Sequence, residues 1–192
     1  EHLPQRMSES EGISVEEAKQ KLVSHYERVE GTIQWYCLDY WAEQTKLPIT
    51  TLKREVEHLI KLREDAEEFL LALKASGRDI VLVTNAHPDS LSLKVEKTAL
   101  ADYIDELIST HEFGVTKESL ALWQHLEKRL NFNKSTTLFI DDSLPILNTA
   151  QAFGIEYLMS IQQPDSQQPH RGITEYPAID SYDVLTQQLL EQ

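Results

Sequence analysis

From Asp79 onward, short apolar runs alternate with helix-like segments, and this alternation constrains the fold more than any other feature of the sequence. The runs lie at 79–84, 106–110, 135–141 and 155–161. Between them, apolar residues recur every three or four positions, which is the spacing of an amphipathic helix. Helices that connect successive strands are typical of a parallel sheet, because parallel strands cannot be joined by a tight turn. The pattern predicts an α/β fold.

The residues before this alternation predict helices and no strand. A capping box of the form S-x-x-E begins at Ser14 and precedes apolar residues at helical spacing. Three further helices are expected, over 32–44, about 50–62 and 65–76. Thr50 or Thr51 is expected to cap the second of these, and Gly77 is expected to end the third. We therefore predict a helical domain over 1–75 and an α/β domain over 76–192, with a last helix from about Tyr182.

Composition and charge argue against several classes of protein. Thirty-two acidic residues outnumber 18 basic ones and leave a net charge of −14, so we do not expect nucleic-acid binding. No apolar run approaches the roughly 18 residues that span a membrane. Cys37 is the single cysteine, which excludes an internal disulfide, and no Cys/His array has the spacing of a structural zinc site. These features favour a reducing cytoplasm, and they make no prediction about oligomeric state.

Polar side chains stand at the carboxyl ends of the predicted strands. Thr84 and Asn85 follow the first strand, Asp141 and Asp142 follow the third, and the loop after the second strand ends in Lys117. Ligands of parallel α/β sheets bind at this edge of the sheet. Carboxylate oxygens suit Mg²⁺, and a lysine ammonium neutralises phosphoryl oxygens. The set therefore favours a phosphorylated ligand bound with magnesium.

Each of these residues also has an ordinary structural interpretation. Thr84 can cap the helix that begins near Pro88. Lys117 can be a solvated surface residue. Asp142 or Ser143 can cap the helix that follows the third strand. The Asp pair is the most informative feature, because adjacent carboxylates repel each other unless a cation or hydrogen-bond donors lie between them.

Three segments at these strand ends resemble motifs II, III and IV of the haloacid dehalogenase (HAD) superfamily. They are VLVTNA (81–86), GVTKES (114–119) and LFIDDS (138–143). The helical segment before them resembles the C1-type cap of that superfamily, whose core is a Rossmann-like parallel sheet. Within the superfamily, WYCLDYW (35–41) and TNAHP (84–88) are similar to the bacterial nucleotidase subgroup that hydrolyses GMP and IMP.

The resemblance implies a Mg²⁺-dependent phosphomonoester hydrolase that acts on purine nucleoside 5′-monophosphates through a phosphoaspartate. It implies that Lys117 stabilises charge on the transferring phosphoryl group and that Asp141 and Asp142 hold Mg²⁺, with Asp142 the more direct ligand. The residues expected to contact the substrate are Thr84, Asn85, His87 and Lys117.

The sequence departs from the family in its first motif. HAD enzymes carry a D-x-D sequence at the end of the first strand, where the first Asp is the nucleophile, and no D-x-D occurs in these 192 residues. Without the nucleophile there is no covalent catalysis, so we expect the chain as it stands to be inactive. Without the strand, the strands at 79–84 and 135–141 lose the neighbour that they share in the family. Because the chain begins at Glu1 rather than Met, we favour a truncated or omitted N-terminal segment over a natural pseudoenzyme.

Several alternatives stay open at this stage. One is a phosphatase of the same superfamily that acts on sugar phosphates or other small molecules, and another is a pseudophosphatase that binds a nucleotide without hydrolysing it. The aromatic segment 35–41 either stacks on a purine or packs the helical core. His87 and His111 are either substrate contacts or surface and capping residues. The Gln- and Pro-rich segment 162–177 is expected to be a surface loop.

Overall fold

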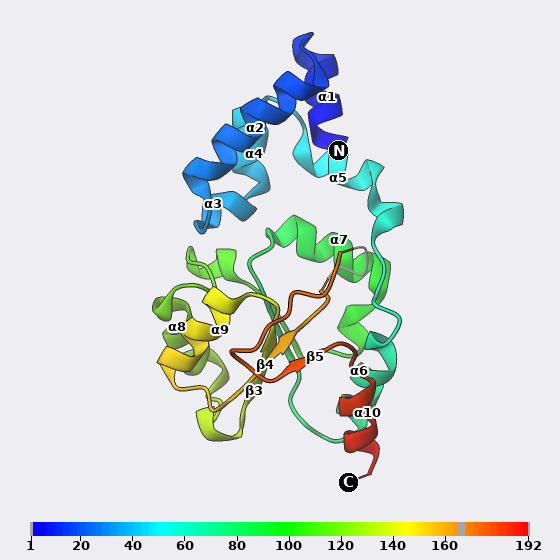
Figure 1. Cartoon of the computed structure of the whole chain (residues 1–192), viewed down its shortest axis with the longest axis vertical. Coiled ribbons are helices and arrows are strands. Elements are labelled where there is room, and N and C mark those ends of the chain that lie inside the picture. The colour runs from blue at the N-terminus through cyan, green and yellow to red at the C-terminus, as the bar shows by residue number, and fades with distance from the viewer. Residues whose placement is uncertain (1, 165–167, 192) are drawn as a thin grey trace. The chain divides into compact units, whose positions relative to one another are not determined.

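The computed structural model describes residues 2–164 and 168–191 (Figure 1). The chain divides into two compact units. Unit 1 comprises Glu1–Lys61, Leu82–Asp102 and Glu106–Thr116, and unit 2 comprises Leu62–Val81, Tyr103–Asp105 and Lys117–Gln192. The division predicted from the sequence, a helical cap over 1–75 and an α/β core over 76–192, rests on the change in apolar spacing along the chain, and it stays a prediction.

The N-terminal part of unit 1 is helical (Figure 1). Its elements are α1 (His2–Glu11), α2 (Val15–Val29), α3 (Ile33–Tyr36), α4 (Leu38–Thr45), α5 (Ile49–Glu55) and the 3₁₀ helix η1 (Glu57–Leu59). Apolar side chains from these helices are buried together in one core: Met7, Ala18, Leu22, Val29, Leu38, Trp41, Ile49 and Leu52. Removal of these side chains from water is the main force that holds the helices together.

The N-cap predicted at Ser14 is confirmed. The Ser14 Oγ accepts a hydrogen bond from the Glu17 N–H at 3.1 Å, and α2 begins at the next residue. The helical spacing of apolar residues is also confirmed, because Ala18, Leu22 and Val29 are the buried residues of α2.

Two predicted helix boundaries are wrong. The helix expected over 32–44 is interrupted at Cys37, which has extended backbone angles (ψ 116°) and separates α3 from α4. The interruption is stabilised by a hydrogen bond that Trp41 Nε1 donates to the carbonyl of Trp35 at 2.9 Å. The helix expected from Thr50 or Thr51 begins instead at Ile49, with Pro48 as its N-cap, and ends at Glu55.

The rest of unit 1 contains the first strands of the described chain. Its elements are β1 (Val81–Thr84), α7 (Pro88–Thr98), the 3₁₀ helices η2 (Leu100–Asp102) and η3 (Thr110–Phe113), and β2 (Glu106–Ser109). β1 and β2 form a two-stranded sheet; Val81, the first residue of β1, belongs to unit 2. The expectation that no strand precedes Asp79 is met throughout the described part of the chain. Pro88 occupies the first turn of α7, where its missing N–H costs no hydrogen bond.

Unit 2 is an α/β unit built on a three-stranded parallel sheet. Its elements are α6 (Ala66–Ala75), α8 (Leu120–Leu130), η4 (Lys134–Thr136), β3 (Leu138–Asp141), α9 (Leu144–Phe153), β4 (Tyr157–Ile161), β5 (Ala178–Ile179) and α10 (Asp183–Leu190). The strand order is β3-β4-β5, and Asp141 lies opposite Ser160 in the register. In Figure 1, α8 and α9 lie to one side of this sheet and α6 and α10 lie to the other.

β1 and β3 belong to separate sheets. β1 pairs with β2, β3 pairs with β4, and no strand of the described residues is hydrogen-bonded to both β1 and β3. This agrees with the sequence analysis, in which the strand that these two would share in the HAD fold is absent.

The described residues of the segment 162–177 are irregular and mostly exposed, as the prediction of a surface loop requires, with a difference at two buried side chains. Its described residues form no helix or strand, but Ile173 and Tyr176 are buried. The Gln162 side chain holds Ile173 through two hydrogen bonds of 2.9 Å, one to its carbonyl and one from its N–H. The unpredicted strand β5 follows directly. The part of the predicted loop at 165–167 lies outside the described residues.

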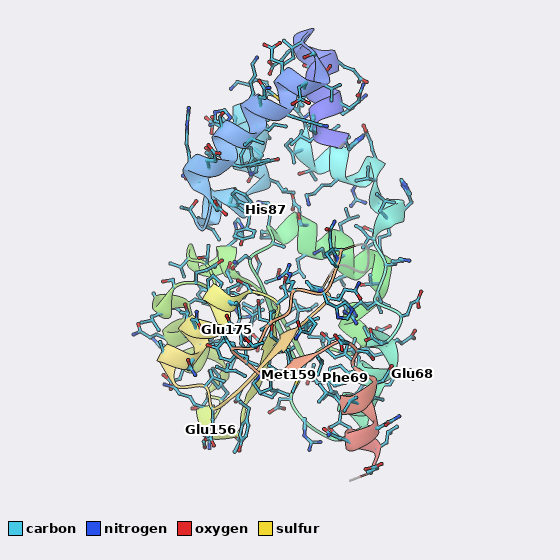
Figure 2. The ribbon with its side chains drawn as sticks, viewed as in Figure 1. Glu68, Phe69, His87, Glu156, Met159 and Glu175 are labelled. Atoms are coloured by element: carbon cyan, nitrogen blue, oxygen red, sulfur yellow. The ribbon has the colours of Figure 1, made fainter. Side chains whose placement is uncertain are left out.

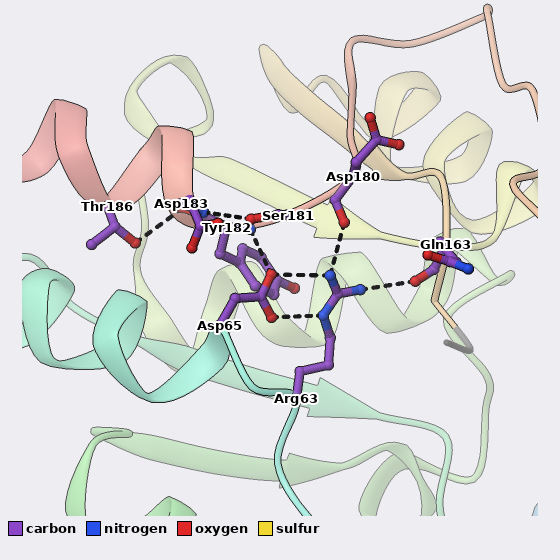
Figure 3. Close-up of polar contacts among 8 residues, drawn as sticks. All are labelled: Arg63, Asp65, Gln163, Asp180, Ser181, Tyr182, Asp183 and Thr186. Carbon is purple, nitrogen blue, oxygen red and sulfur yellow. Dashed lines mark hydrogen bonds and ion pairs between the residues drawn. The ribbon is translucent and has the colours of Figure 1, made fainter. Parts of the chain in front are cut away.

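A polar network at Arg63 fastens the start of α6 to the segment before α10 (Figure 3). The Arg63 guanidinium donates to both carboxylate oxygens of Asp65 at 2.8 and 3.0 Å, and to the carbonyls of Gln163 and Asp180 at 2.8 Å each. Asp65 also accepts from the Tyr182 N–H at 2.8 Å. The Phe69 and Tyr182 rings stack beside the network, with centroids 4.6 Å apart (Phe69 is labelled in Figure 2).

None of the helices in the described part of the chain is both long enough and apolar enough to cross a membrane.

Candidate active site

Lys117 and Asp141 meet at the carboxyl end of β3. The Lys117 Nζ donates to Asp141 Oδ2 at 2.5 Å, and the Asp141 side chain is only 5% exposed. The other oxygen of Asp141, Oδ1, accepts from the N–H of Ser143 at 3.0 Å. Burial of an ion is tolerated only where a counter-ion and hydrogen bonds replace water. Lys117 and Asp141, which the sequence placed after different strands, thus form a buried ion pair within unit 2.

Packing around Trp123 fixes the backbone of Lys117. The Trp123 Nε1–H donates to the Lys117 carbonyl at 3.0 Å. The indole packs edge-on against Phe139 of β3, with centroids 4.8 Å apart. Thr149 of α9 adds a hydrogen bond to the carbonyl of Glu118 at 3.2 Å. Lys117 is thus anchored to β3 and α9, and its position does not depend on the side chain alone.

Asp142 pairs with a cation that was not among the predicted site residues. Arg171 Nη1 lies 3.2 Å from Asp142 Oδ2 and donates to the Asp142 carbonyl at 2.7 Å. Both side chains are about half exposed. In the sequence, Arg171 stands in an irregular segment far from Asp142, so no periodicity or local motif connects the two residues. Ser143 is the N-cap residue of α9, as one of the structural alternatives expected, but its side chain makes no capping hydrogen bond, and Asp142 does not occupy the cap position.

Thr84 and Asn85 lie at the end of β1 in unit 1. The Thr84 Oγ1 accepts from the Ala86 N–H at 3.1 Å, which leaves the hydroxyl proton for another acceptor. Thr84 does not cap α7, since the N-cap of that helix is His87. Asn85 is buried, and its Oδ1 accepts from the Thr110 hydroxyl at 3.1 Å.

His87 is largely buried at the start of α7 (Figure 2). Its Nδ1 accepts from the Asp89 N–H at 3.3 Å, and its Nε2 lies 3.5 Å from Asp39 Oδ2. The ring of His111 stands edge-on to it, with centroids 5.1 Å apart. Burial is the main cause that holds the pKa of His111 below its usual value, and the nearby His87 lowers it further.

The predicted site residues thus fall into two groups. Lys117, Asp141 and Asp142 belong to unit 2, whereas Thr84, Asn85 and His87 belong to unit 1. Nothing in the sequence indicates that Arg171 is joined to Asp142 or that Asp39 is joined to His87. Both contacts cross long stretches of sequence, and only the tertiary structure reveals them.

The carboxylate oxygens of Asp141 and Asp142 are suitable ligands for Mg²⁺. Mg²⁺ takes oxygen ligands and is commonly held by one or two carboxylates together with water and substrate phosphate. Asp141 and Asp142 supply two carboxylates on consecutive residues, and Asp142 is accessible to solvent. Both Asp141 oxygens already accept hydrogen bonds, so Asp142 has the more available oxygens.

The sequence matches known proteins along most of its length. The family model of haloacid dehalogenase-like hydrolases matches residues 7–154. The chain is 40% identical over 180 residues to the GMP/IMP nucleotidase YrfG of Escherichia coli (strain K12), covering 94% of this chain and 81% of that protein. It is 28% identical over 130 residues to a ribulose-1,5-bisphosphate 5-phosphatase of Halopiger xanaduensis, covering 66% of this chain and 54% of that protein.

Solved structures agree with the fold. A HAD phosphatase from Thermococcus onnurineus superposes with a TM-score of 0.80 at 20% identity, covering 97% of this chain and 86% of that one. The L-2-haloacid dehalogenase from Xanthobacter autotrophicus has a TM-score of 0.61 at 14% identity, covering 90% of this chain and 83% of that one. These comparisons confirm the predicted HAD-like α/β fold, the resemblance to the nucleotidase subgroup and the prediction of a phosphatase of this family. The chain belongs to the haloacid dehalogenase-like hydrolase family.

Proposed function

We propose that this protein is a Mg²⁺-dependent phosphomonoesterase of the cytoplasm that acts on purine nucleoside 5′-monophosphates such as GMP and IMP. The observation that carries the proposal is the 40% identity to a GMP/IMP nucleotidase over 94% of this chain. The grouping of Lys117 with the Asp pair at one strand end supports it, because that is the chemistry a phosphate monoester and its metal require.

In the proposed reaction, Lys117 neutralises charge on the phosphoryl oxygens. Phosphoryl transfer depends on positioning and on electrostatic stabilisation more than on acid strength. Asp141 holds the ammonium in place and is itself held by the Ser143 N–H. Asp141 and Asp142 would hold Mg²⁺, which when bound supplies further neutralisation of the phosphate charge. Arg171 orients Asp142 through both its carbonyl and its carboxylate.

On unit 1, we assign Thr84 to the phosphoryl group. Its hydroxyl proton can donate to a phosphoryl oxygen, since the hydroxyl oxygen already accepts from Ala86. Asn85 holds the strand end through Thr110, and His87 presents a ring nitrogen beside Asp39. We propose that residues 1–75 serve as the cap and 76–192 as the core.

A cavity in unit 1 supports a purine substrate. It has a volume of about 370 Å³ and is lined by aromatic and basic side chains, among them Tyr26, Trp35, Trp41, Lys53 and Lys94. Trp41 is buried, so the core-packing interpretation holds for it. Trp35 is only partly buried and lines the cavity beside Tyr26, with ring centroids 5.2 Å apart, and we assign it as the aromatic ring on which a flat base stacks.

The proposal also takes account of the missing nucleophile, because no D-x-D sequence occurs in the 192 residues. We propose that the chain by itself binds the nucleotide without hydrolysing it, and that hydrolysis requires a strand carrying the nucleophilic Asp. A pseudophosphatase that only binds nucleotides is the second candidate, and the same absence favours it.

The test measures both binding and phosphate release. GMP, IMP and a sugar phosphate are titrated into the 192-residue chain with Mg²⁺, and phosphate release is assayed on this chain and on a form extended by a D-x-D strand. We expect binding of GMP and IMP by both forms and turnover by the extended form alone. Binding without turnover in both forms identifies the pseudophosphatase, and preference for the sugar phosphate refutes the purine assignment.

Two variants of the extended form test the site. Lys117→Ala and Asp142→Asn should each lower kcat/KM by about 10²–10³-fold, the usual cost of one electrostatic contact to a transition state. Lys128→Ala, at an exposed position on α8, is the matched control and should be unchanged. Equal turnover by all three variants would contradict the assignment of the site.

A further inference from the structure

Three potential metal ligands gather in unit 1 from distant parts of the sequence. They are Cys37, His87 and His111, and one ligand atom from each lies within 4.8 Å of the other two. Among the described residues, these three side chains are the group of His, Cys, Asp or Glu residues whose ligand atoms come this close together. Sequence spacing gave no indication of it, because no Cys/His array occurs along the chain.

Local structure fixes where each ligand stands. Cys37 occupies the interruption between α3 and α4, where the backbone is extended. His87 is the N-cap of α7. His111 lies in η3, and its own N–H donates to the hydroxyl of the N-cap residue Ser109 at 3.4 Å. The three positions are therefore set by backbone features and do not depend on side-chain rotation alone.

One nitrogen of this group is buried without a partner. His111 Nε2 has no hydrogen bond within the described residues, although it is shielded from solvent. A buried polar nitrogen that lacks a partner costs stability and calls for an explanation such as an ion. The same ring is hydrogen-bonded to the backbone of Asn85, as metal-binding imidazoles commonly are through their other nitrogen.

We propose that Cys37, His87 and His111 form a binding site for a thiophilic divalent cation of the Zn²⁺ type. A thiolate with two imidazoles is a donor set that Zn²⁺ binds and that Mg²⁺, which prefers oxygen, does not. Binding replaces the thiol proton of Cys37 by the metal, so one proton is released to solvent. The fourth position is open to water or to Asp39, whose Oδ2 lies 3.5 Å from His87 Nε2.

The site needs only a small closure to bind the ion. Zn–N and Zn–S distances of about 2.0–2.3 Å place tetrahedral ligands about 3.3–3.8 Å apart, so the donors must approach by about 1 Å. Asp39 is exposed on the first turn of α4 and is able to move. The inference does not rest on the proposed nucleotidase function, because it involves neither phosphate nor the Asp pair.

Cobalt substitution tests the site directly. Co²⁺ titrated into the reduced 192-residue chain should give a thiolate-to-metal charge-transfer band at one equivalent, and Zn²⁺ should abolish the band while excess Mg²⁺ should not. Because Cys37 is the single cysteine, such a band can arise only from it. Cys37→Ser should remove the band, and His111→Ala should weaken Co²⁺ binding at least 10-fold. His58→Asn, at an exposed histidine of η1, is the matched control and should bind as the unmodified chain does.

A measurement on the unmodified chain guards against variants that fail to fold. One equivalent of Zn²⁺ should slow alkylation of Cys37 by iodoacetamide at least 10-fold, and a chelator should restore the rate. Alkylation at the same rate with and without Zn²⁺ would overturn the proposal. So would a charge-transfer band that persists unchanged in a folded His111→Ala variant.

Discussion

We predict that Arg63→Ala loosens the docking of α10 on α6. Arg63 donates to both oxygens of Asp65 and to two backbone carbonyls, and its guanidinium lies 5.5 Å from the centre of the Tyr182 ring. Alanine removes all of these contacts at once. The two carbonyls can turn to water, but Asp65, with a side chain only 13% exposed, is left without a counter-ion and with hydrogen bonds only from backbone N–H groups, among them that of Tyr182.

The size of the effect follows from the burial of the pair. Removing one partner of a fully buried ion pair costs about 3–5 kcal/mol. The Arg63 side chain is 32% exposed, so water replaces part of what is lost and the figure must be reduced. We expect a loss of about 2–4 kcal/mol in the free energy of opening α6 and α10, which corresponds to about 30- to 1,000-fold faster exchange of their amides.

The effect should depend on pH. Burial by itself raises the pKa of Asp65, but hydrogen bonds from Arg63 and the Tyr182 N–H outweigh it and hold the pKa below its usual value. The stabilisation is therefore fully present above the unfolded pKa of about 3.9, and it is lost as the pH falls through the lower folded value. The difference between the variant and the unmodified chain should be the same at pH 7 and pH 5 and should shrink in more acidic solution.

Hydrogen–deuterium exchange by mass spectrometry measures this locally. Peptides from α6 and α10 report the opening, and peptides from α2 in unit 1 serve as the internal reference. Lys61→Ala controls for the loss of a nearby exposed positive charge. Exchange of α6 and α10 within threefold of that control, or a difference that persists undiminished below the folded pKa of Asp65, would refute the reasoning.

Three further predictions follow from single contacts. Lys117→Met leaves the buried Asp141 without its counter-ion and should destabilise unit 2 by about 3–5 kcal/mol, measured by urea denaturation; adding Asp141→Asn should restore much of this. Ser14→Ala removes the N-cap of α2 and should cost about 1 kcal/mol, seen as faster amide exchange in its first turn than in Ser24→Ala. Gly77→Ala should cost about 1–2 kcal/mol in thermal denaturation, from its φ of +69° alone, since nothing lies within 4 Å of the added carbon.

Local patterns in the sequence predicted the elements that depend on local physics. The cap at Ser14, the end of α6 before Gly77 and the alternation of strands with helices were all confirmed. Each depends on contacts within a few residues, so the amino-acid order contains the necessary information. The short segments that resemble family motifs also predicted the family, and they supplied the candidate residues of the site.

Boundaries that depend on tertiary packing were predicted wrongly or missed. The interruption at Cys37 is stabilised by the Trp41–Trp35 hydrogen bond, which no helical periodicity contains. β5 is two residues long and exists because β4 offers it an edge.

The sequence by itself determined the family, the α/β class and the candidate residues at each strand end, because these are encoded in short segments whose chemistry is local. The tertiary structure alone decided which side chains meet. Lys117 reaches Asp141 across 24 residues, Arg171 reaches Asp142 across 29, and Cys37, His87 and His111 converge from three elements. The physical reason is that contacts between residues far apart in the sequence depend on how whole helices and strands pack. The residue type at one position does not indicate which distant residue it will contact.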